Sequence, residues 1–146
     1  MANKLLLVDG SAIIHRAYHA MPSLTDKKGR QSGATYGVAR MMVKAITDMD
    51  PTHLIVALDR PEPTFRKQIF IGYQAQRPPA EPELVDQFNR ARELFSLMKI
   101  KVLDKAGYEA DDVIGTITHK AVEDGFEFVE IVTGDKDLMQ LVNDKV

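Results

Sequence analysis

The sequence contains no cysteine. This absence excludes disulfides and thiolate metal sites, and it fits a protein of a reducing compartment. No apolar run approaches the roughly 18 residues that a membrane span requires. The first residues lead directly into a short apolar run with no small-residue cleavage site after it, which is not the layout of a signal peptide. We therefore expect a cytoplasmic protein with no membrane partner.

The chain also lacks a strong excess of one charge. Its net charge is -2, so bulk charge does not predict a nucleic-acid binder. The distribution is uneven: residues 27–44 carry basic side chains and no acid, residues 60–77 carry mainly basic ones, and acids gather at 104–112. A basic flank beside an acidic cluster suits a phosphodiester held against metal-binding carboxylates. Two solvated faces are the alternative, and charge alone favours that alternative.

Several motifs of α/β enzymes are missing. The sequence has neither G-x-G-x-x-G nor G-x-x-x-x-G-K-[ST], so nucleotide-binding loops lack support. An aspartyl-phosphate phosphatase needs a second acid two residues after Asp9, where this chain has Ser11. No G-x-S-x-G elbow is present. The four histidines show no metal-ligand spacing beyond His15 and His19, and we interpret them as structural or exposed.

The pattern of apolar residues predicts strands that alternate with helices. Buried strands are expected at 5–8, 54–58, 100–103 and 128–132, and helices at about 11–19, 34–49, 82–98 and 109–123, with Ser11 able to cap the first helix. Residues 20–32 are expected to form a loop, and 60–80 an exposed excursion with one or two helical turns near 65–70. At 146 residues the chain is expected to be one α/β domain whose parallel sheet is covered on both faces.

Acidic residues follow each of the four predicted strands. In an open α/β sheet, ligands bind outside the carboxyl ends of the strands. The fold should therefore collect seven carboxylates at one edge: Asp9, Asp59, Glu109, Asp111, Asp112, Asp135 and Asp137. So many negative charges would repel one another unless a cation neutralised them. Oxygen ligands without histidine or cysteine select hard cations, which predicts Mg²⁺ or Mn²⁺.

Each acid also has a purely structural interpretation. Aspartate at a strand end or helix start is a common turn or capping residue, and Asp9, Asp59 and Asp135 taken singly fit that role. Glu109, Asp111 and Asp112 alone would complement a helix dipole. Acids at four separate strand ends are less easily explained in this way, so the pattern favours a shared metal site.

Several segments resemble a known family. Residues 7–11 and 16–20, then 33–38, 51–53, 64–66 and 77–79, are similar to the 5′ nuclease domain of bacterial DNA polymerase I and its standalone 5′→3′ exonuclease relatives. The most specific blocks are Glu109-Ala-Asp-Asp-Val-Ile-Gly-Thr116 and Thr133-Gly-Asp-Lys-Asp137. The resemblance covers essentially the whole chain.

The resemblance implies a three-layer α/β/α PIN-like (resolvase-like) domain and a flap-endonuclease-like activity on DNA with 5′ ends or flaps, in replication and repair. It implies two divalent metal ions and in-line attack by metal-activated water. Asp9, Asp59, Glu109 and Asp111 would serve the first metal with Asp112 in support, and Asp135 and Asp137 the second. Residues 60–80 would begin the family's helical arch, with Arg66, Lys67 and Arg77 holding phosphates and Phe65 or Tyr73 stacking a base; Phe65 could equally anchor the excursion to the core.

The chain departs from the family at two points. The family has Tyr-Lys-x-x-Arg in the arch, whereas this chain has Gln74 in place of the lysine that points at the scissile phosphate. The chain also ends at Val146, before the family's further aspartates and helix-hairpin-helix element, so 1–146 is expected to be the N-terminal subdomain of a longer nuclease, with a polymerase as a possible covalent partner. A nuclease-like DNA-binding module without competent chemistry, or a PIN-type ribonuclease, stays open as an alternative.

Overall fold

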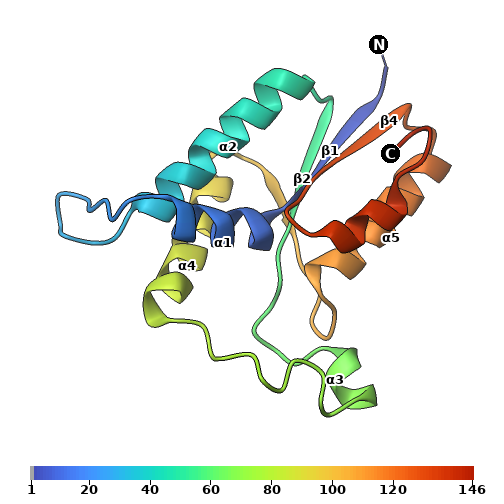
Figure 1. The fold of residues 1–146 in the computed structure, drawn as a ribbon. Helices are drawn as coiled ribbons and strands as arrows, with labels where there is room; N and C mark the ends of the chain where they lie inside the picture. The colour runs from blue at the N-terminus through green and yellow to red at the C-terminus, as the bar shows by residue number, and fades with distance from the viewer. Residues whose placement is uncertain (1) are drawn as a thin grey trace.

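The computed structural model describes residues 2–146, and its centre is one parallel sheet. Its strands are β1 (Lys4–Asp9), β2 (His53–Ala57), β3 (Lys101–Leu103) and β4 (Phe128–Val132). The order across the sheet is β3-β2-β1-β4, and every neighbouring pair is parallel (Figure 1). β1 is buried on both faces of the sheet, which explains why its sequence is continuously apolar rather than alternating.

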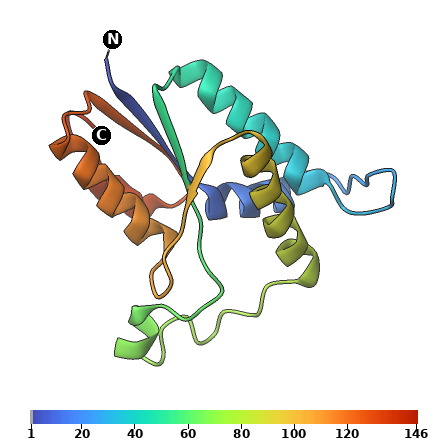
Figure 2. The ribbon, with the colours of Figure 1, turned by 180° about the vertical axis from the view of Figure 1, so that it is seen from behind.

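Helices cover both faces of this sheet. On one face, the side chains of α1 (Gly10–Ala20), α2 (Gly33–Met49) and α4 (Pro82–Leu97) share a core with Leu6, Val8 and Val56. On the other face, α5 (Ala110–Glu123) packs with Leu5, Leu7 and Val129 (Figure 2). Alternate residues of β1 therefore enter opposite cores. The predicted three-layer α/β/α fold with a parallel sheet is confirmed.

The structure corrects some local expectations. Asp9, not Ser11, caps α1, because its side chain accepts a hydrogen bond from the Ala12 N–H. After Asp135 the chain forms a 3₁₀ helix, η1 (Lys136–Leu141). In α4 the apolar side chains of Leu84, Ala91 and Phe95 are buried, and Gln87 is buried beside them at 1% exposure. Local sequence gave no signal for this buried amide, because its partners lie far away in the chain.

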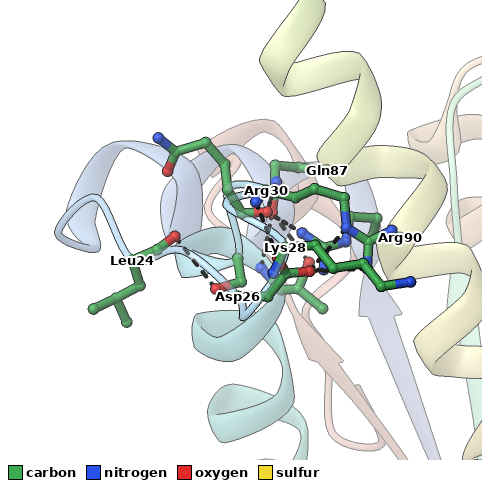
Figure 3. A network of polar contacts seen from close by, with 9 residues as sticks. Leu24, Asp26, Lys28, Arg30, Gln87 and Arg90 are labelled. Atoms are coloured by element: carbon green, nitrogen blue, oxygen red, sulfur yellow. Dashed lines mark hydrogen bonds and ion pairs between the residues drawn. The ribbon is translucent and has the colours of Figure 1, made fainter.

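Gln87 belongs to a polar network that holds the loop of residues 21–32. Its amide accepts from the Thr35 N–H at the start of α2 and donates to the Gln31 carbonyl at 2.7 Å. Asp26 accepts from the backbone of Arg30 and pairs with the side chains of Arg30 and Arg90 (Figure 3). The predicted loop is therefore ordered by side chains of α4 rather than by a hydrophobic core of its own.

The excursion at 60–80 leaves the body of the fold. It contains one short helix, α3 (Phe65–Ile69), at the place where one or two helical turns were predicted. Figure 1 shows α3 between two long connections, beyond the end of the sheet to which β2 runs. Ile69, Phe70 and Ile71 are exposed. Among residues 2–146, no helix combines the length and hydropathy needed to cross a bilayer.

Candidate functional site

The topology creates one site at the carboxyl ends of the strands. From β1 the chain builds outward to β2 and β3, and only then crosses back to place β4 on the other side of β1. The switch point therefore lies between β1 and β4, where α/β sheets bind ligands. Asp9 ends β1, and Thr133 with Asp135 follows β4, so the chain places acids on both sides of this point.

A pocket of about 1740 Å³ opens there. The seven acids predicted from the sequence all line it: Asp9, Asp59, Glu109, Asp111, Asp112, Asp135 and Asp137. The five residues expected to contact DNA line it as well: Arg66, Lys67, Tyr73, Gln74 and Arg77. Helices α1 and α5, the excursion and the segment after β4 thus contribute to one surface, although these parts are far apart in sequence.

Asp9 is the most buried acid of the site, at 4% exposure. One carboxylate oxygen accepts from the Ala12 N–H at 3.0 Å, and the other accepts from the Thr133 hydroxyl at 2.8 Å. Burial raises the pKa of Asp9, the two hydrogen bonds oppose that rise, and Asp59 and Asp135 add to it by repulsion. The capping role expected for Asp9 taken singly is therefore present, and the hydrogen bond from Thr133 holds the same carboxylate towards the end of β4.

Asp59 and Ser11 hold the next strand end in place. The Asp59 side chain accepts from the Ala110 N–H, at the start of α5, at 2.8 Å. The Asp59 N–H donates to the buried Ser11 hydroxyl at 2.9 Å. Asp59 thus satisfies a free N–H of a helix that begins 51 residues later. One of its two carboxylate oxygens has no hydrogen bond with residues 2–146.

Asp111 lies where the negative charges meet. Burial raises its pKa to about 7, and repulsion by Asp9, Asp135 and Asp59 adds to the effect. A hydrogen bond with the Asp135 side chain, which requires a proton on one of the two carboxyl groups, raises the pKa of Asp111 further. Asp135 is held by its neighbours, since its N–H donates to Thr133 and its side chain accepts from the Asp137 N–H. Asp111 is therefore the acid that is most strained electrostatically.

Residues of the excursion contact the acids at the start of α5. Both Arg66 guanidinium Nη atoms lie 2.7 Å from oxygens of Asp112, and Nη1 is also 3.2 Å from Glu109. The hydrogen bond from Arg66 lowers the pKa of Asp112. The Tyr73 hydroxyl donates to Glu109 at 3.1 Å, and the Gln74 amide reaches the same oxygen at 3.4 Å. The sequence predicted that these side chains share a site, but not these pairings.

Lys67 and Arg77 differ from Arg66. Both are exposed and line the pocket, and neither has an ion pair among residues 2–146. Their charges are therefore available to an anion in the pocket. The Phe65 ring packs against Tyr108 in a tilted arrangement, with ring centroids 5.4 Å apart. It therefore anchors the excursion, as one of its two expected roles required, but to the β3–α5 loop rather than to the core.

Three residues that lie in or against the site were not among those predicted for it. Ser11 and Thr133 hold the backbone or carboxylates of Asp59, Asp9 and Asp135. Both belong to the motif blocks, which was the available signal. His15 lines the pocket with its ring edge-on to Phe88, and burial lowers its pKa. Our interpretation of His15 as merely structural or exposed did not anticipate this placement.

The donor chemistry of the pocket fits a hard cation. Its candidate ligands are carboxylate oxygens, and the mutual repulsion that raises the pKa of Asp111 is what a divalent cation would relieve. Within residues 2–146, however, no group of three or more Asp, Glu or His side chains forms a set that could hold a metal ion as it stands. The acids therefore share a pocket without three of them meeting at one point.

Comparisons with known proteins agree on one family. Residues 4–146 match the model of the 5′-3′ exonuclease, N-terminal resolvase-like domain. DNA polymerase I of Bacillus subtilis is 44% identical over 142 residues, which are 97% of this chain and 16% of that protein. The 5′-3′ exonuclease of Aquifex aeolicus is 39% identical over 142 residues, 97% of this chain and 49% of that protein.

The fold comparison gives the same picture. The T5 D15 protein, solved with metal ions, superposes with a TM-score of 0.72 at 20% identity, covering 99% of this chain and 54% of that one. At this level of identity the likeness establishes the fold. The chain thus spans about half or less of the length of the proteins it matches.

Proposed function

Because the chain belongs to the family of 5′-3′ exonuclease N-terminal resolvase-like domains, we propose that it supplies the metal-binding part of a two-metal-ion 5′ nuclease. The substrate is DNA with 5′ ends or 5′ flaps, and the reaction is hydrolysis of a phosphodiester near that end. The cofactor is Mg²⁺ or Mn²⁺. We further propose that the parent protein acts in replication and repair in the bacterial cytoplasm, at the nucleoid, joined to a polymerase.

One observation carries this proposal: acids from four strand ends line a single pocket, together with residues of the excursion. A fold that buries Asp9 and raises the pKa of Asp111 to about 7 accepts an electrostatic cost there. Such a cost is typical of sites built for a charged ligand. The relatives named DNA polymerase I and 5′-3′ exonuclease, and the metal ions crystallised with the T5 D15 protein, support the same assignment.

The position of each side chain determines its proposed role. Asp9, Asp59, Glu109 and Asp111 would hold the first ion and Asp135 and Asp137 the second, while Asp112 supports the first group. Two ions held there would supply positive charge to polarise the phosphate and would activate a water for in-line attack. Thr133 and Ser11 keep Asp9 and Asp59 oriented. Lys67 and Arg77 attract the phosphates of the 5′ strand, and the Tyr73 ring offers a stacking surface.

The test uses a chimera, because the chain spans 49% of the Aquifex aeolicus exonuclease. This chain replaces the matching half of that enzyme, and single-turnover cleavage of a labelled 5′-flap DNA is measured with Mg²⁺, with Mn²⁺ and with a chelator. Cleavage should require the divalent ion. Asp111→Asn should slow it on the order of a hundredfold, because a neutral amide is a weaker ligand for a divalent ion than a carboxylate. Asp86→Asn, on the exposed side of α4, should leave the rate unchanged.

Metal-independent cleavage, or equal rates in both variants, would refute the proposal. The isolated chain should cleave far more slowly than the chimera, because two-metal catalysis needs both ions on one phosphate. A matching RNA flap in the same assay tests the ribonuclease alternative, which expects RNA to be cut faster than DNA.

A second candidate function is DNA binding without cleavage. The observation that favours it is Gln74, which occupies the place of a lysine in the family pattern and contacts Glu109 as a neutral amide. Under this alternative the chimera binds flap DNA and metal but does not cleave. The cleavage assay therefore separates the two functions directly.

A further inference from the structure

The contact between α3 and the start of α5 is more extensive than a phosphate-binding arginine requires. Arg66 makes a two-pronged ion pair with Asp112, at 2.7 Å for each prong, and a third contact with Glu109 at 3.2 Å. Its side chain is 32% exposed, and those of its two partners are 22% and 18% exposed. Paired, partly desolvated guanidinium and carboxylate groups hold a fixed geometry that a surface ion pair does not.

Asp112 is also bound to the backbone that it helps to shape. The oxygen that faces Nη1 of Arg66 accepts from the Glu109 N–H at 2.9 Å. One carboxylate oxygen therefore ties Arg66 to the first turn of α5. The turn between these two acids contains Asp111, whose carboxylate faces Asp9 and Asp135 across the pocket. The orientation of Asp111 thus depends on how residues 109–112 are held.

A second set of contacts fixes Arg66 itself. The Phe65 N–H donates to the Gly107 carbonyl at 2.8 Å, and the Phe65 ring packs on Tyr108. The Arg66 guanidinium lies over the Phe65 ring, 4.7 Å from its centre. The start of α3 is therefore fastened to the β3–α5 loop through backbone and side chains, and the guanidinium has little freedom to turn towards DNA.

We propose that Arg66 is a positioning residue, which orients Glu109 and the 109–112 turn for metal binding, rather than a phosphate-binding residue. The inference rests on the proposed function, since it concerns the same metal site. Both oxygens of Asp112 are engaged by Arg66, so Asp112 acts by anchoring this arginine and the Glu109 backbone. Arg66 also couples the position of the excursion to the acids that the excursion covers.

Two other roles for Arg66 give opposite expectations. If Arg66 only adds positive charge near the site, its removal should tighten the binding of a cation, because less charge opposes it. If Arg66 binds phosphate, its removal should weaken DNA binding but leave cation binding in the absence of DNA unchanged or tighter. Lysine at this position should then restore most of the DNA binding, because it also binds phosphate as a point charge. A positioning role predicts weaker cation binding.

The experiment measures Mn²⁺ binding to this chain without DNA, by the electron paramagnetic resonance signal of free Mn²⁺. Arg66→Gln should weaken binding by about tenfold or more, as substitution of groups that orient metal ligands does. Arg66→Lys should weaken it as well, because an ammonium cannot form the two-pronged pair. The control is Arg16→Gln, an exposed arginine that lines the same pocket and has no ion pair among residues 2–146.

A double-mutant cycle locates the effect. Asp112→Asn should weaken Mn²⁺ binding in the native background and add little to Arg66→Gln, since both changes break one interaction. Circular dichroism checks the fold of each variant, and Arg66→Lys keeps the charge if Arg66→Gln fails to fold. Unchanged or tighter Mn²⁺ binding in Arg66→Lys overturns the proposal, as do additive effects in the cycle. If the native chain binds no Mn²⁺, the proposed function is refuted, and the proposal for Arg66 is refuted with it.

Discussion

Asp111→Asn is expected to stabilise the fold when divalent ions are removed and to weaken the stabilisation that Mn²⁺ provides. The reason is the position of Asp111, where burial and repulsion by Asp9, Asp135 and Asp59 raise the pKa of its carboxyl to about 7. Asparagine has nearly the same shape and carries no charge. It therefore removes the repulsion while leaving packing almost unchanged.

The magnitude follows from the pKa of Asp111. A rise from 3.8 to about 7 corresponds to about 4 kcal/mol of unfavourable folding free energy when the carboxyl is ionised. Because the side chain is partly exposed, solvent screening reduces this, and we expect roughly 1–2 kcal/mol. The cost is complete above the folded pKa and vanishes below the unfolded one, so the advantage of asparagine should shrink as the pH falls from about 7 towards 3.8.

The assay is thermal unfolding at pH 8 in a chelator. For a domain of this size, about 1–2 kcal/mol corresponds to a melting temperature roughly 3–6 °C higher in Asp111→Asn. Asp86→Asn is the matched control, because Asp86 is exposed on α4 and does not line the pocket. The control should change the melting temperature little, as surface substitutions generally do.

Addition of Mn²⁺ should reverse the order. An ion at 100 times its dissociation constant adds about 2.7 kcal/mol to the native protein, and the asparagine variant should gain much less. The two melting temperatures should therefore cross as the Mn²⁺ concentration rises. A lower melting temperature of Asp111→Asn in chelator, or equal gains from Mn²⁺ in both proteins, would show that the acids do not form a shared cation site.

Three further predictions test other parts of the structure. Gln74→Lys in the chimera should accelerate single-turnover flap cleavage roughly tenfold, since a charge that lowers the activation free energy by about 1.4 kcal/mol raises the rate by a factor of ten. If the rate is unchanged and Lys67→Ala or Arg77→Ala loses most of the activity, a neighbouring cation compensates instead. Thr133→Val removes the hydroxyl shared by Asp9 and Asp135 and should lower the free energy of unfolding in urea by about 1–3 kcal/mol; an unchanged value would contradict the role given to this hydroxyl. Gln87→Leu fills the same space but leaves the Thr35 N–H without its partner, so it should lower the free energy of unfolding by about 1–3 kcal/mol. Amide hydrogens of the 21–32 loop should also exchange faster; exchange at the native rate would argue against the network as the source of order.

The sequence by itself determined the elements and the nature of the site. β1 was predictable because a strand buried on both sides is continuously apolar, and α3 because prolines isolate a short helical pattern. The seven acids could be assigned to one edge because parallel strands end on the same side. The expected chemistry of the site, oxygen ligands for a hard cation, also needed only residue types.

Only the tertiary structure decided which side chains meet. The strand order β3-β2-β1-β4, which puts β4 beside β1 and creates the switch point, follows from the packing of whole helices rather than from any local pattern. Thr133 reaches Asp9 across 124 residues, and Arg66 reaches Asp112 across 46. Such pairings depend on the path of the backbone through space, whereas a sequence pattern reports only the preferences of neighbouring residues. For that reason the sequence identified Arg66 as a cation near the site, but its two carboxylate partners became visible only in the fold.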